Sequence, residues 1–350
     1  MYLVRVVVID DSALMRKIIA DMLNSDHRIK VVATARNGKD GLEKIKTYKP
    51  DVITLDVEMP VMDGMTALQK IMAKHPLPVV MLSSVTKEGA AKTVQAIAGG
   101  AVDFIEKPSG TISLDLGEMK QEIINKVLIA SEAKLIRSKE SESAHPPFVP
   151  GLLQRIYGGT IVTIGTSTGG PKALQQVLTS LPSDFPSPIL IVQHMPAGFT
   201  KSLANRLDSL AHIHVKEAVH GERIKNGVAY IAPGDFHMKI HSSGTAHTIE
   251  LTKDLHQNGH RPAVDVLFGS IANIKINKIA VVLTGMGSDG ANGLKMIREQ
   301  DEKAVMIAEA EETSVVYGMP KAAVMTNHVD HIVPLPQIGE IIAKLIKRPN

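Results

Sequence analysis

The first 130 residues alternate between short apolar runs and helical patterns, and this alternation restricts the fold more than any other feature of the chain. Such an order is typical of parallel strands joined by crossover helices. The predicted strands are Val6–Ile9, Val31–Ala33, Val52–Leu55, Val79–Leu82 and Val102–Ile105. The predicted helices include Ala13–Leu23, Gly41–Ile45, Thr66–Ala73 and Ala90–Ala98. We therefore expect an α/β fold with a parallel sheet and helices on both of its faces.

Four of the predicted strands end in polar residues, namely Asp10 and Asp11, Asp56, Ser83 and Lys107. In a parallel sheet, such side chains gather where ligands bind, beyond the carboxyl ends of the strands. Converging carboxylates repel one another unless a cation is present, and oxygen ligands suit Mg2+. A carboxylate can also accept a phosphoryl group, which a nearby lysine would bind. Each aspartate alone can equally start a turn, but the shared position of all four strand ends favours a site.

This set of residues resembles that of two-component receiver domains, and the resemblance covers about residues 1–125. It implies a flavodoxin-like (βα)5 fold. It also implies that Asp56 is phosphorylated by a chemotaxis histidine kinase, and that Asp10, Asp11 and Asp56 hold the Mg2+ needed for that reaction.

The same resemblance assigns the switch residues of the receiver. It implies that Lys107 senses the phosphate, that Ser83 supplies the switch hydroxyl, and that Phe104 is the aromatic residue that moves with it. It further implies a cis peptide bond between Lys107 and Pro108, which is feasible because proline lowers the cost of the cis form.

A linker is predicted over residues 126–154. A helical pattern over Glu118–Arg137 passes into Ser138–Pro147, which is rich in Ser, Glu and Pro. Such a composition buries too little apolar surface to order itself. A tether of this kind keeps two domains at high effective concentration, so even a weak contact between them is populated. It can also be a passive spacer.

Residues 155–350 alternate again and predict a second α/β domain with a largely parallel sheet. Its predicted helix Ala291–Glu299 follows one of its longer apolar runs. The predicted strands are Ile161–Ile164, Ile189–Val192, Val228–Ala232, His247–Leu251, Ile279–Leu283, Val305–Ala308 and Ile332–Val333.

The turn after the first of these strands reads Gly165-Thr-Ser-Thr-Gly169 and leads into a helical pattern that opens at Pro171. Strand, Gly-x-Ser-x-Gly and helix form the layout of a nucleophile elbow, which presents Ser167 near the amide groups of a helix N-terminus. Glycine-rich turns also cradle phosphates, and many are only turns. A dinucleotide fingerprint would need glycine at position 167, so that reading is disfavoured.

Two further strand ends carry possible partners for Ser167, namely His194 and Asp289. A serine hydroxyl needs an imidazole to take its proton, and the imidazole needs a carboxylate to fix its tautomer. Asp289 can also be a helix N-cap. The order Ser, His, Asp departs from that of the α/β-hydrolases, so the domain is not assigned to them.

An oxyanion hole is also required, because each donor aimed at the developing charge contributes roughly 3–4 kcal/mol. The candidate donors are the backbone N–H groups of Thr168, Gly169 and Met286. A metal site is the weaker alternative, because His237 and His241 lie four residues apart without a third ligand at suitable spacing.

Several segments of the second half resemble, in the same order, the catalytic domain of the chemotaxis receptor methylesterases. The resemblance implies Ser167 as nucleophile, His194 as base and then acid, Asp289 as its orienter and Met286 as an oxyanion donor. The segments are Gly165–Pro171, Gln193–Pro196, Ala232–Gly234 with His237, His260–Pro262 with Asp265, Gly285–Ala291 and Tyr317–Pro320.

With a receiver in front, the whole chain resembles the chemotaxis response regulators that are protein-glutamate methylesterases. The resemblance implies hydrolysis of γ-glutamyl methyl esters on the cytoplasmic helices of methyl-accepting chemoreceptors, with release of methanol, and deamidation of receptor glutamine. It also implies that phosphorylation of the receiver raises this activity, and that the esterase reaction needs no cofactor. The protein would then be cytoplasmic and recruited to chemoreceptor arrays.

Composition supports a globular protein of this kind, with 44% hydrophobic residues, no cysteine and a net charge of +3. That charge is too small to argue for nucleic acid, and no apolar run is long enough to span a membrane. Two other classes stay open: a receiver joined to a DNA-binding module, or one joined to a small-molecule binding domain. The first predicts a helix-turn-helix and a basic face, which the second half lacks.

Overall fold

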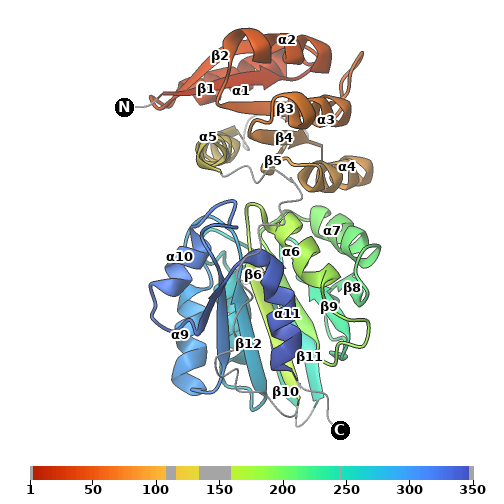
Figure 1. Cartoon of the computed structure of the whole chain (residues 1–350), viewed down its shortest axis with the longest axis vertical. Helices are drawn as coiled ribbons and strands as arrows, with labels where there is room; N and C mark the ends of the chain where they lie inside the picture. The colour runs from red at the N-terminus through yellow and green to blue at the C-terminus, as the bar shows by residue number, and fades with distance from the viewer. Residues whose placement is uncertain (1–2, 85, 108–115, 134–158, 244–245, 347–350) are drawn as a thin grey trace. The chain divides into compact units, whose positions relative to one another are not determined.

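The computed structural model of the chain describes residues 3–84, 86–107, 116–133, 159–243 and 246–346. It divides into two compact units, residues 1–135 and 136–350. Each unit is built around its own parallel sheet with helices packed on it (Figure 1). No helix among the described residues is long and apolar enough to cross a membrane.

The first unit contains a five-stranded sheet in the order β2-β1-β3-β4-β5, and all of its strand pairs are parallel. The five predicted strands are therefore confirmed. The order changes direction between β1 and β3, which is where ligands bind in open sheets of this kind. The strands are β1 (Val4–Ile9), β2 (Ile29–Ala35), β3 (Val52–Asp56), β4 (Val79–Ser83) and β5 (Asp103–Glu106).

The helices of the first unit form two groups. Helices α1 and α5 pack against each other, and α3 packs against both α2 and α4, so each group covers one face of the sheet. The helices are α1 (Ala13–Asn24), α2 (Gly38–Tyr48), α3 (Gly64–Lys74), α4 (Lys87–Ala98) and α5 (Leu116–Glu132). Because α5 also packs on β3, β4 and β5, residues 126–132 belong to this fold and not to the linker predicted from residue 126. The predicted flexible stretch that follows lies outside the described residues.

The second unit contains a seven-stranded sheet in the order β14-β13-β12-β6-β7-β9-β8. Every strand pair in it is parallel, which confirms the predicted type of sheet. The order changes direction between β6 and β12. The strands are β6 (Thr160–Thr166), β7 (Ile189–Gln193), β8 (His214–Glu217), β9 (Val228–Ile231), β12 (Asn277–Val282), β13 (Val305–Glu309) and β14 (His331–Val333).

An antiparallel hairpin, separate from this sheet, joins β10 (His237–Ser243) to β11 (Ala246–Thr252). One core lies between the hairpin, helices α8 to α10 and one face of the sheet, with Phe268, Tyr230 and Met306 among its buried residues. Helices α6, α7 and α11 pack together elsewhere on the sheet. The helices are α6 (Gly170–Thr179), α7 (Phe199–Asp208), α8 (Val264–Ala272), α9 (Ala291–Gln300), α10 (Met319–Val324) and α11 (Leu335–Leu345).

Candidate active site

Ser167 lies between β6 and α6, at the carboxyl edge of the seven-stranded sheet. Its backbone N–H donates to the carbonyl of Thr284 at 3.1 Å, and its carbonyl accepts the N–H of Gly170 at 2.8 Å. Gly169 has φ 80°, a region that glycine enters without strain. A Cβ atom on Gly170 would collide with Oε1 of Gln193. The tight turn that presents Ser167 therefore depends on both glycines.

His194 follows β7, the strand next to β6, so it lies beside Ser167 at the same edge. The register pairs Thr166 with Gln193, and the N–H of His194 donates to the carbonyl of Thr166 at 3.1 Å. The buried amide of Gln193 donates to the carbonyls of both Ser167, at 2.9 Å, and His194, at 3.3 Å. One side chain that sequence reasoning does not single out thus ties the two turns together.

Asp289 reaches His194 from the loop between β12 and α9, on the other side of β6. Its Oδ2 lies 2.8 Å from Nε2 of His194, and both side chains are buried. The carboxylate also accepts the backbone N–H groups of Val264 at 2.7 Å, Asp265 at 3.0 Å and Gly290 at 3.1 Å. Burial alone would raise the pKa of Asp289, but the neighbouring imidazole, followed by the N–H groups of Asp265 and Val264, lowers it to about 2. Asp289 is therefore an anion that only accepts hydrogen bonds.

Asp265 is the counterpart of Asp289. Asp265 lies in the first turn of α8, and Asp289 lies just before α9. Asp289 binds the N-terminus of α8, whereas Asp265 accepts the N–H groups of Gly290 at 2.9 Å and Gly293 at 2.7 Å at the N-terminus of α9. The amide of Asn258 bridges the pair, at 3.0 Å from Asp265 and 3.2 Å from Asp289. Burial raises the pKa of Asp265; the N–H of Gly293 opposes this, and the charge of Asp289 adds to it. The N-cap alternative for Asp289 is therefore wrong, because the N-cap of α9 is Gly290; the Asp289 carboxylate instead accepts the first N–H groups of α8 from a separate loop.

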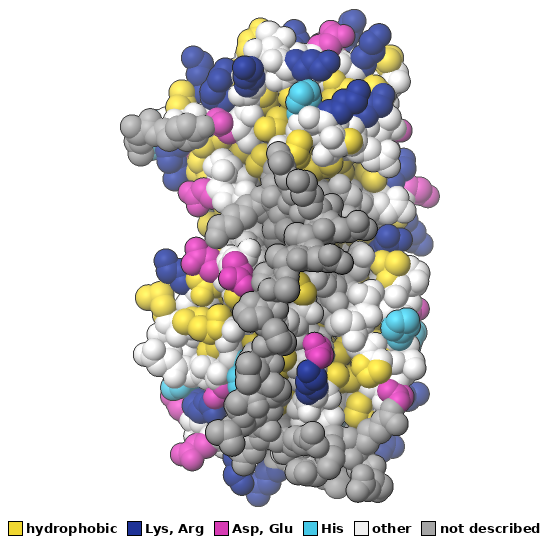
Figure 2. Space-filling view, in the orientation of Figure 1, with side chains coloured by type: hydrophobic (Ala, Val, Ile, Leu, Met, Phe, Trp, Pro, Cys, Tyr) yellow, Lys and Arg dark blue, Asp and Glu magenta, His cyan; other side chains and the backbone are white. Residues whose placement is uncertain are grey.

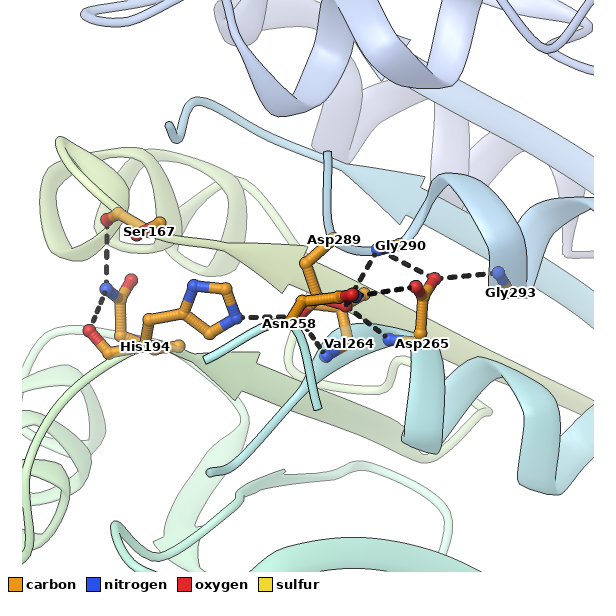
Figure 3. A network of polar contacts seen from close by, with 9 residues as sticks. Ser167, His194, Asn258, Val264, Asp265, Asp289, Gly290 and Gly293 are labelled. Atoms are coloured by element: carbon orange, nitrogen blue, oxygen red, sulfur yellow. Dashed lines mark hydrogen bonds and ion pairs between the residues drawn. The ribbon is translucent and has the colours of Figure 1, made fainter. Parts of the chain in front are cut away.

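The hydroxyl of Ser167 and the ring of His194 are not hydrogen-bonded to each other. Nδ1 of His194 is buried and has no hydrogen-bond partner among the described residues. Figure 3 shows Ser167, His194 and Asp289 in succession, with the Nε2 edge of the imidazole turned to Asp289. The nitrogen that remains for Ser167 is therefore Nδ1. Catalytic hydrogen bonds are often absent before substrate binds.

The loop that carries Met286 packs against Ser167. A Cβ atom on Gly285 would lie 2.8 Å from Cβ of Ser167. The carbonyl of Gly285 accepts the N–H groups of Gly318 at 3.1 Å and Met319 at 2.8 Å. In a trans peptide the N–H points opposite to the carbonyl, so the N–H of Met286 faces away from these two residues. Met286 is 45% exposed and does not fill the core.

Behind this loop lies Glu309, a carboxyl group that sequence reasoning does not reveal. It ends β13, is 0% exposed, and accepts the N–H of Thr284 at 2.7 Å and the hydroxyl of Thr313 at 3.1 Å. Burial raises the pKa of Glu309 to about 7. The carbonyl of Thr284 in turn accepts the N–H of Ser167. Glu309 therefore holds Thr284, and Thr284 holds the turn that carries the candidate nucleophile.

In the first unit, the structure brings the three predicted metal ligands together. Carboxylate oxygens of Asp10, Asp11 and Asp56 lie within 4.8 Å of one another, a donor set that fits a hard cation such as Mg2+. Nζ of Lys107 lies 2.8 Å from Asp10 and 2.7 Å from Asp56. Burial raises the pKa of Asp56 to about 6, although Lys107 opposes this. Asp10 and Asp56 are thus two buried carboxylates that share one lysine, and a bound cation would balance the remaining negative charge.

The predicted switch residues are buried. Ser83 is 0% exposed and accepts a hydrogen bond from the hydroxyl of Thr93 in α4 at 2.6 Å. Phe104 is 3% exposed, and Nζ of Lys126 lies 5.0 Å from the centre of its ring. The Lys107–Pro108 bond lies outside the described residues. The cis bond found among them is Arg261–Pro262.

Comparison with known families matches each unit to one model. The model described as response regulator receiver domain matches residues 6–115, and the model described as CheB methylesterase matches residues 162–342.

Individual relatives match nearly the whole chain. A protein-glutamate methylesterase/protein-glutamine glutaminase of Oceanobacillus iheyensis is 55% identical over 97% of this chain and 98% of its own length. The corresponding Bacillus subtilis protein is 46% identical over 99% of each chain. The solved CheB methylesterase catalytic domain of Thermotoga maritima is 45% identical, with a TM-score of 0.52 over 54% of this chain and all of its own. The chain therefore belongs to the protein-glutamate methylesterase/protein-glutamine glutaminase family of enzymes, with a response regulator receiver domain ahead of its CheB methylesterase domain.

Proposed function

We propose that this chain hydrolyses γ-glutamyl methyl esters on the cytoplasmic helices of chemoreceptors by a Ser167-His194-Asp289 triad, and that it deamidates receptor glutamine by the same route. The observation that carries the proposal is the 2.8 Å contact between His194 and an ionised Asp289, with Nδ1 of the same ring left open at the Ser167 edge. This edge lies where the strand order of the sheet changes direction, the usual location of a site in such folds.

The tautomer of His194 follows from the charge of Asp289. A carboxylate whose pKa is about 2 has no proton to give at neutral pH, so Nε2 of His194 must donate to it. Nδ1 then carries the lone pair and is the base that takes the proton of the Ser167 hydroxyl. The two ring nitrogens exchange the roles that they have in chymotrypsin-like proteases, where the aspartate binds Nδ1.

The tetrahedral intermediate needs donors for its negative oxygen, and the N–H groups of Thr168 and Met286 are our candidates. Thr168 directly follows Ser167 and lies two residues before α6, and the Met286 loop, which follows the neighbouring strand β12, packs against Ser167. Breakdown of the intermediate passes the proton from Nδ1 to methanol. Water then attacks the acyl group on Ser167 and restores the carboxylate of the receptor. In deamidation, ammonia leaves instead of methanol.

The first unit is proposed to regulate this reaction. Asp56 would accept the phosphoryl group from a chemotaxis histidine kinase, with Asp10, Asp11 and Asp56 holding Mg2+. The bound Mg2+ would neutralise charge on the phosphoryl oxygens, and Lys107 would bind one of them. Ser83 and Phe104 would then respond, and the esterase activity would rise. The cytoplasm and its chemoreceptor arrays are the proposed location.

A DNA-binding role for the second unit has less support. On the face of this unit shown in Figure 2, acidic and basic side chains lie near one another and form no basic stripe. The all-parallel sheet also leaves no place for a helix-turn-helix as the main feature of the domain.

Mass spectrometry of a methylated receptor fragment incubated with the protein tests the proposal. We expect loss of methyl groups with the wild type, faster with Mg2+ and a small phosphodonor. Ser167→Ala should lower the rate on the order of a thousand-fold or more, whereas Ser209→Ala, at an exposed serine, should not. Equal rates for Ser167→Ala and the wild type would exclude the triad, and no loss under any condition would favour a binding module.

A further inference from the structure

A four-residue turn, Gln257–His260, lies against two members of the candidate triad. The N–H of Gln257 donates to the carbonyl of His260 at 3.1 Å, and the reverse bond measures 2.9 Å. Its central residues have positive φ angles, 54° at Asn258 and 80° at Gly259. An Asn-Gly pair with both φ angles positive is favoured in type I′ turns, so the local sequence itself determines this shape.

The first functional side chain of the turn is Asn258. The residue is exposed overall, yet its amide Nδ2 points inward and donates to Asp289 at 3.2 Å and to Asp265 at 3.0 Å. Both hydrogens of one NH2 group are thereby used to hold two like-charged carboxyl groups side by side. The backbone N–H of Gly290 also contacts both carboxylates, at 2.9 Å from Asp265 and 3.1 Å from Asp289, so the amide of Asn258 is the side-chain bridge beside this backbone one.

The second is His260. Its ring stacks on the ring of His194, with 3.8 Å between centroids and 14° between planes. The hydrogen bond to Asp289 holds only the Nε2 end of His194, and the ring can still turn about that contact. A flat ring packed on its face removes this freedom and keeps water from that face.

The turn is anchored beyond its own hydrogen bonds. The guanidinium of Arg261 pairs with Asp235 and donates to the carbonyls of Lys253 at 3.3 Å and Asp254 at 3.1 Å. Arg261 is mostly buried, and its hydrogen bonds join the two ends of the loop formed by residues 253–261. The backbone that carries Asn258 and His260 is thus fixed on both sides of the turn.

We propose that the Gln257–His260 turn is a positioning element of the esterase site: Asn258 fixes the Asp289 carboxylate, and His260 fixes the plane of the His194 imidazole. Nδ1 of His194 is thereby held toward Ser167. This inference rests on the proposed function, because it assigns a task to residues that act through His194 and Asp289. Neither Asn258 nor His260 is a catalytic residue in this account.

The experiment measures kcat and KM for demethylation of a receptor fragment with the full-length protein and four variants. His260→Ala should lower kcat about tenfold with KM unchanged, because a stacking contact of this kind is lost. His260→Phe keeps a flat ring and should recover most of the rate. Asn258→Gly keeps the positive φ without the amide and should lower kcat about fivefold, because Asp289 retains its backbone donors. His256→Ala, at an exposed neighbouring histidine, is the matched control.

The unfolding midpoint is recorded for every variant. An unchanged midpoint shows that a lower kcat comes from a mispositioned His194 or Asp289 and not from a less stable protein. The proposal is supported when His260→Ala loses kcat at an unchanged midpoint and His260→Phe restores it. It is overturned when His260→Ala matches His256→Ala, when Phe fails to restore the rate, or when the change falls on KM alone. Wild-type activity that Ser167→Ala abolishes, together with a normal His260→Ala, would leave the proposed function intact and remove only this inference. An inactive wild type would remove the proposed function first.

Discussion

Helices begin differently in the two units of this protein. In the first unit, α1 to α4 each begin at a residue whose side chain accepts a hydrogen bond from the first helical turn: Ser12, Asn37, Asp63 and Thr86. In the second unit, the N-caps make no such bond and are mostly glycine: Gly169, Gly198, Ala263, Gly290, Gly318 and Pro334. In the first unit the capping residue of each helix thus binds the first N–H groups, whereas in the second unit the capping residues do not.

The free helix ends lie where the chemistry is proposed. The first N–H groups of a helix have no partner within it and attract negative charge. In the second unit α8 receives Asp289, α9 receives Asp265, and α6 begins beside Ser167. Two helix ends without a local side-chain cap thus bind the carboxylates of Asp289 and Asp265, and a third begins beside the candidate nucleophile.

The same contrast extends to the carboxylates at the two switch points of strand order. Asp56 receives one N–H contact, at 3.4 Å from Glu58, and its pKa rises to about 6. Asp289 receives three backbone N–H groups and its pKa falls to about 2. A carboxylate short of donors is suited to bind a cation and accept a phosphoryl group, whereas a fully bonded one is suited to orient an imidazole.

The largest expected effect comes from removing the charge of the fully bonded carboxylate. Asp289→Asn should lower kcat for demethylation on the order of 10,000-fold, because an amide can hold His194 in the wrong tautomer. The rate is measured on a receptor fragment, with Glu299→Gln on the exposed side of α9 as the control. A loss below tenfold would mean that Asp289 is only a helix cap.

In the first unit, Lys107 is the only side-chain cation that the described residues place on Asp10 and Asp56. Lys107→Met should cost about 3 kcal/mol of stability at pH 7, because it leaves two buried carboxylates facing each other. Adding Mg2+ should restore part of it. Lys92→Met, at a surface pair with Glu58, should cost under about 1 kcal/mol. Equal denaturation midpoints for the two variants would show that Lys107 is not needed to balance the buried carboxylates of Asp10 and Asp56.

Glu309 supplies the pH dependence expected of the second unit. Its folded pKa of about 7 lies above the ordinary value of 4.5, so its contribution to stability is complete below about pH 4.5 and is lost as pH rises through about 7. The loss is on the order of 2–3 kcal/mol. Glu309→Gln should remove that slope and be more stable than the wild type at pH 8, as urea denaturation would reveal. Glu302→Gln, at an exposed position, should keep it; a slope that survives Glu309→Gln would show that another group titrates.

The smallest effect concerns a local cap. The carboxylate of Asp63 accepts the N–H of Thr66 at 2.7 Å at the start of α3. Asp63→Ala should destabilise the first unit by about 1 kcal/mol, measured by chemical denaturation. Lys74→Ala, at an exposed position at the other end of α3, is the control. An unchanged midpoint would show that side-chain caps matter little here.

Sequence alone predicts the strands, the parallel sheets and the polar residues at their ends, because apolar runs and the residues after them are local signals. It misses β8, a short edge strand with few apolar residues, and β10, the first strand of the hairpin. It also misses the helices α7, α8, α10 and α11, of which α8 is mostly apolar and shows no clear helical period. It also misses the tasks of Gln193, Asn258 and Glu309. Their contacts join residues from separate strands and loops, and no local pattern marks them.

The most direct test of the account is the tautomer of His194, read from the ring nitrogen shifts of 15N-histidine-labelled protein by NMR, with His194→Gln to assign the signal. The imidazole of His194 and the N–H groups at the start of α8 together lower the pKa of Asp289 to about 2, so the neutral ring should carry its proton on Nε2, with Nδ1 unprotonated and ready for Ser167. In Asp289→Asn that preference should be lost. A neutral His194 with its proton on Nδ1 in the wild type would contradict the assignment of the base and, with it, the role given to the free helix ends.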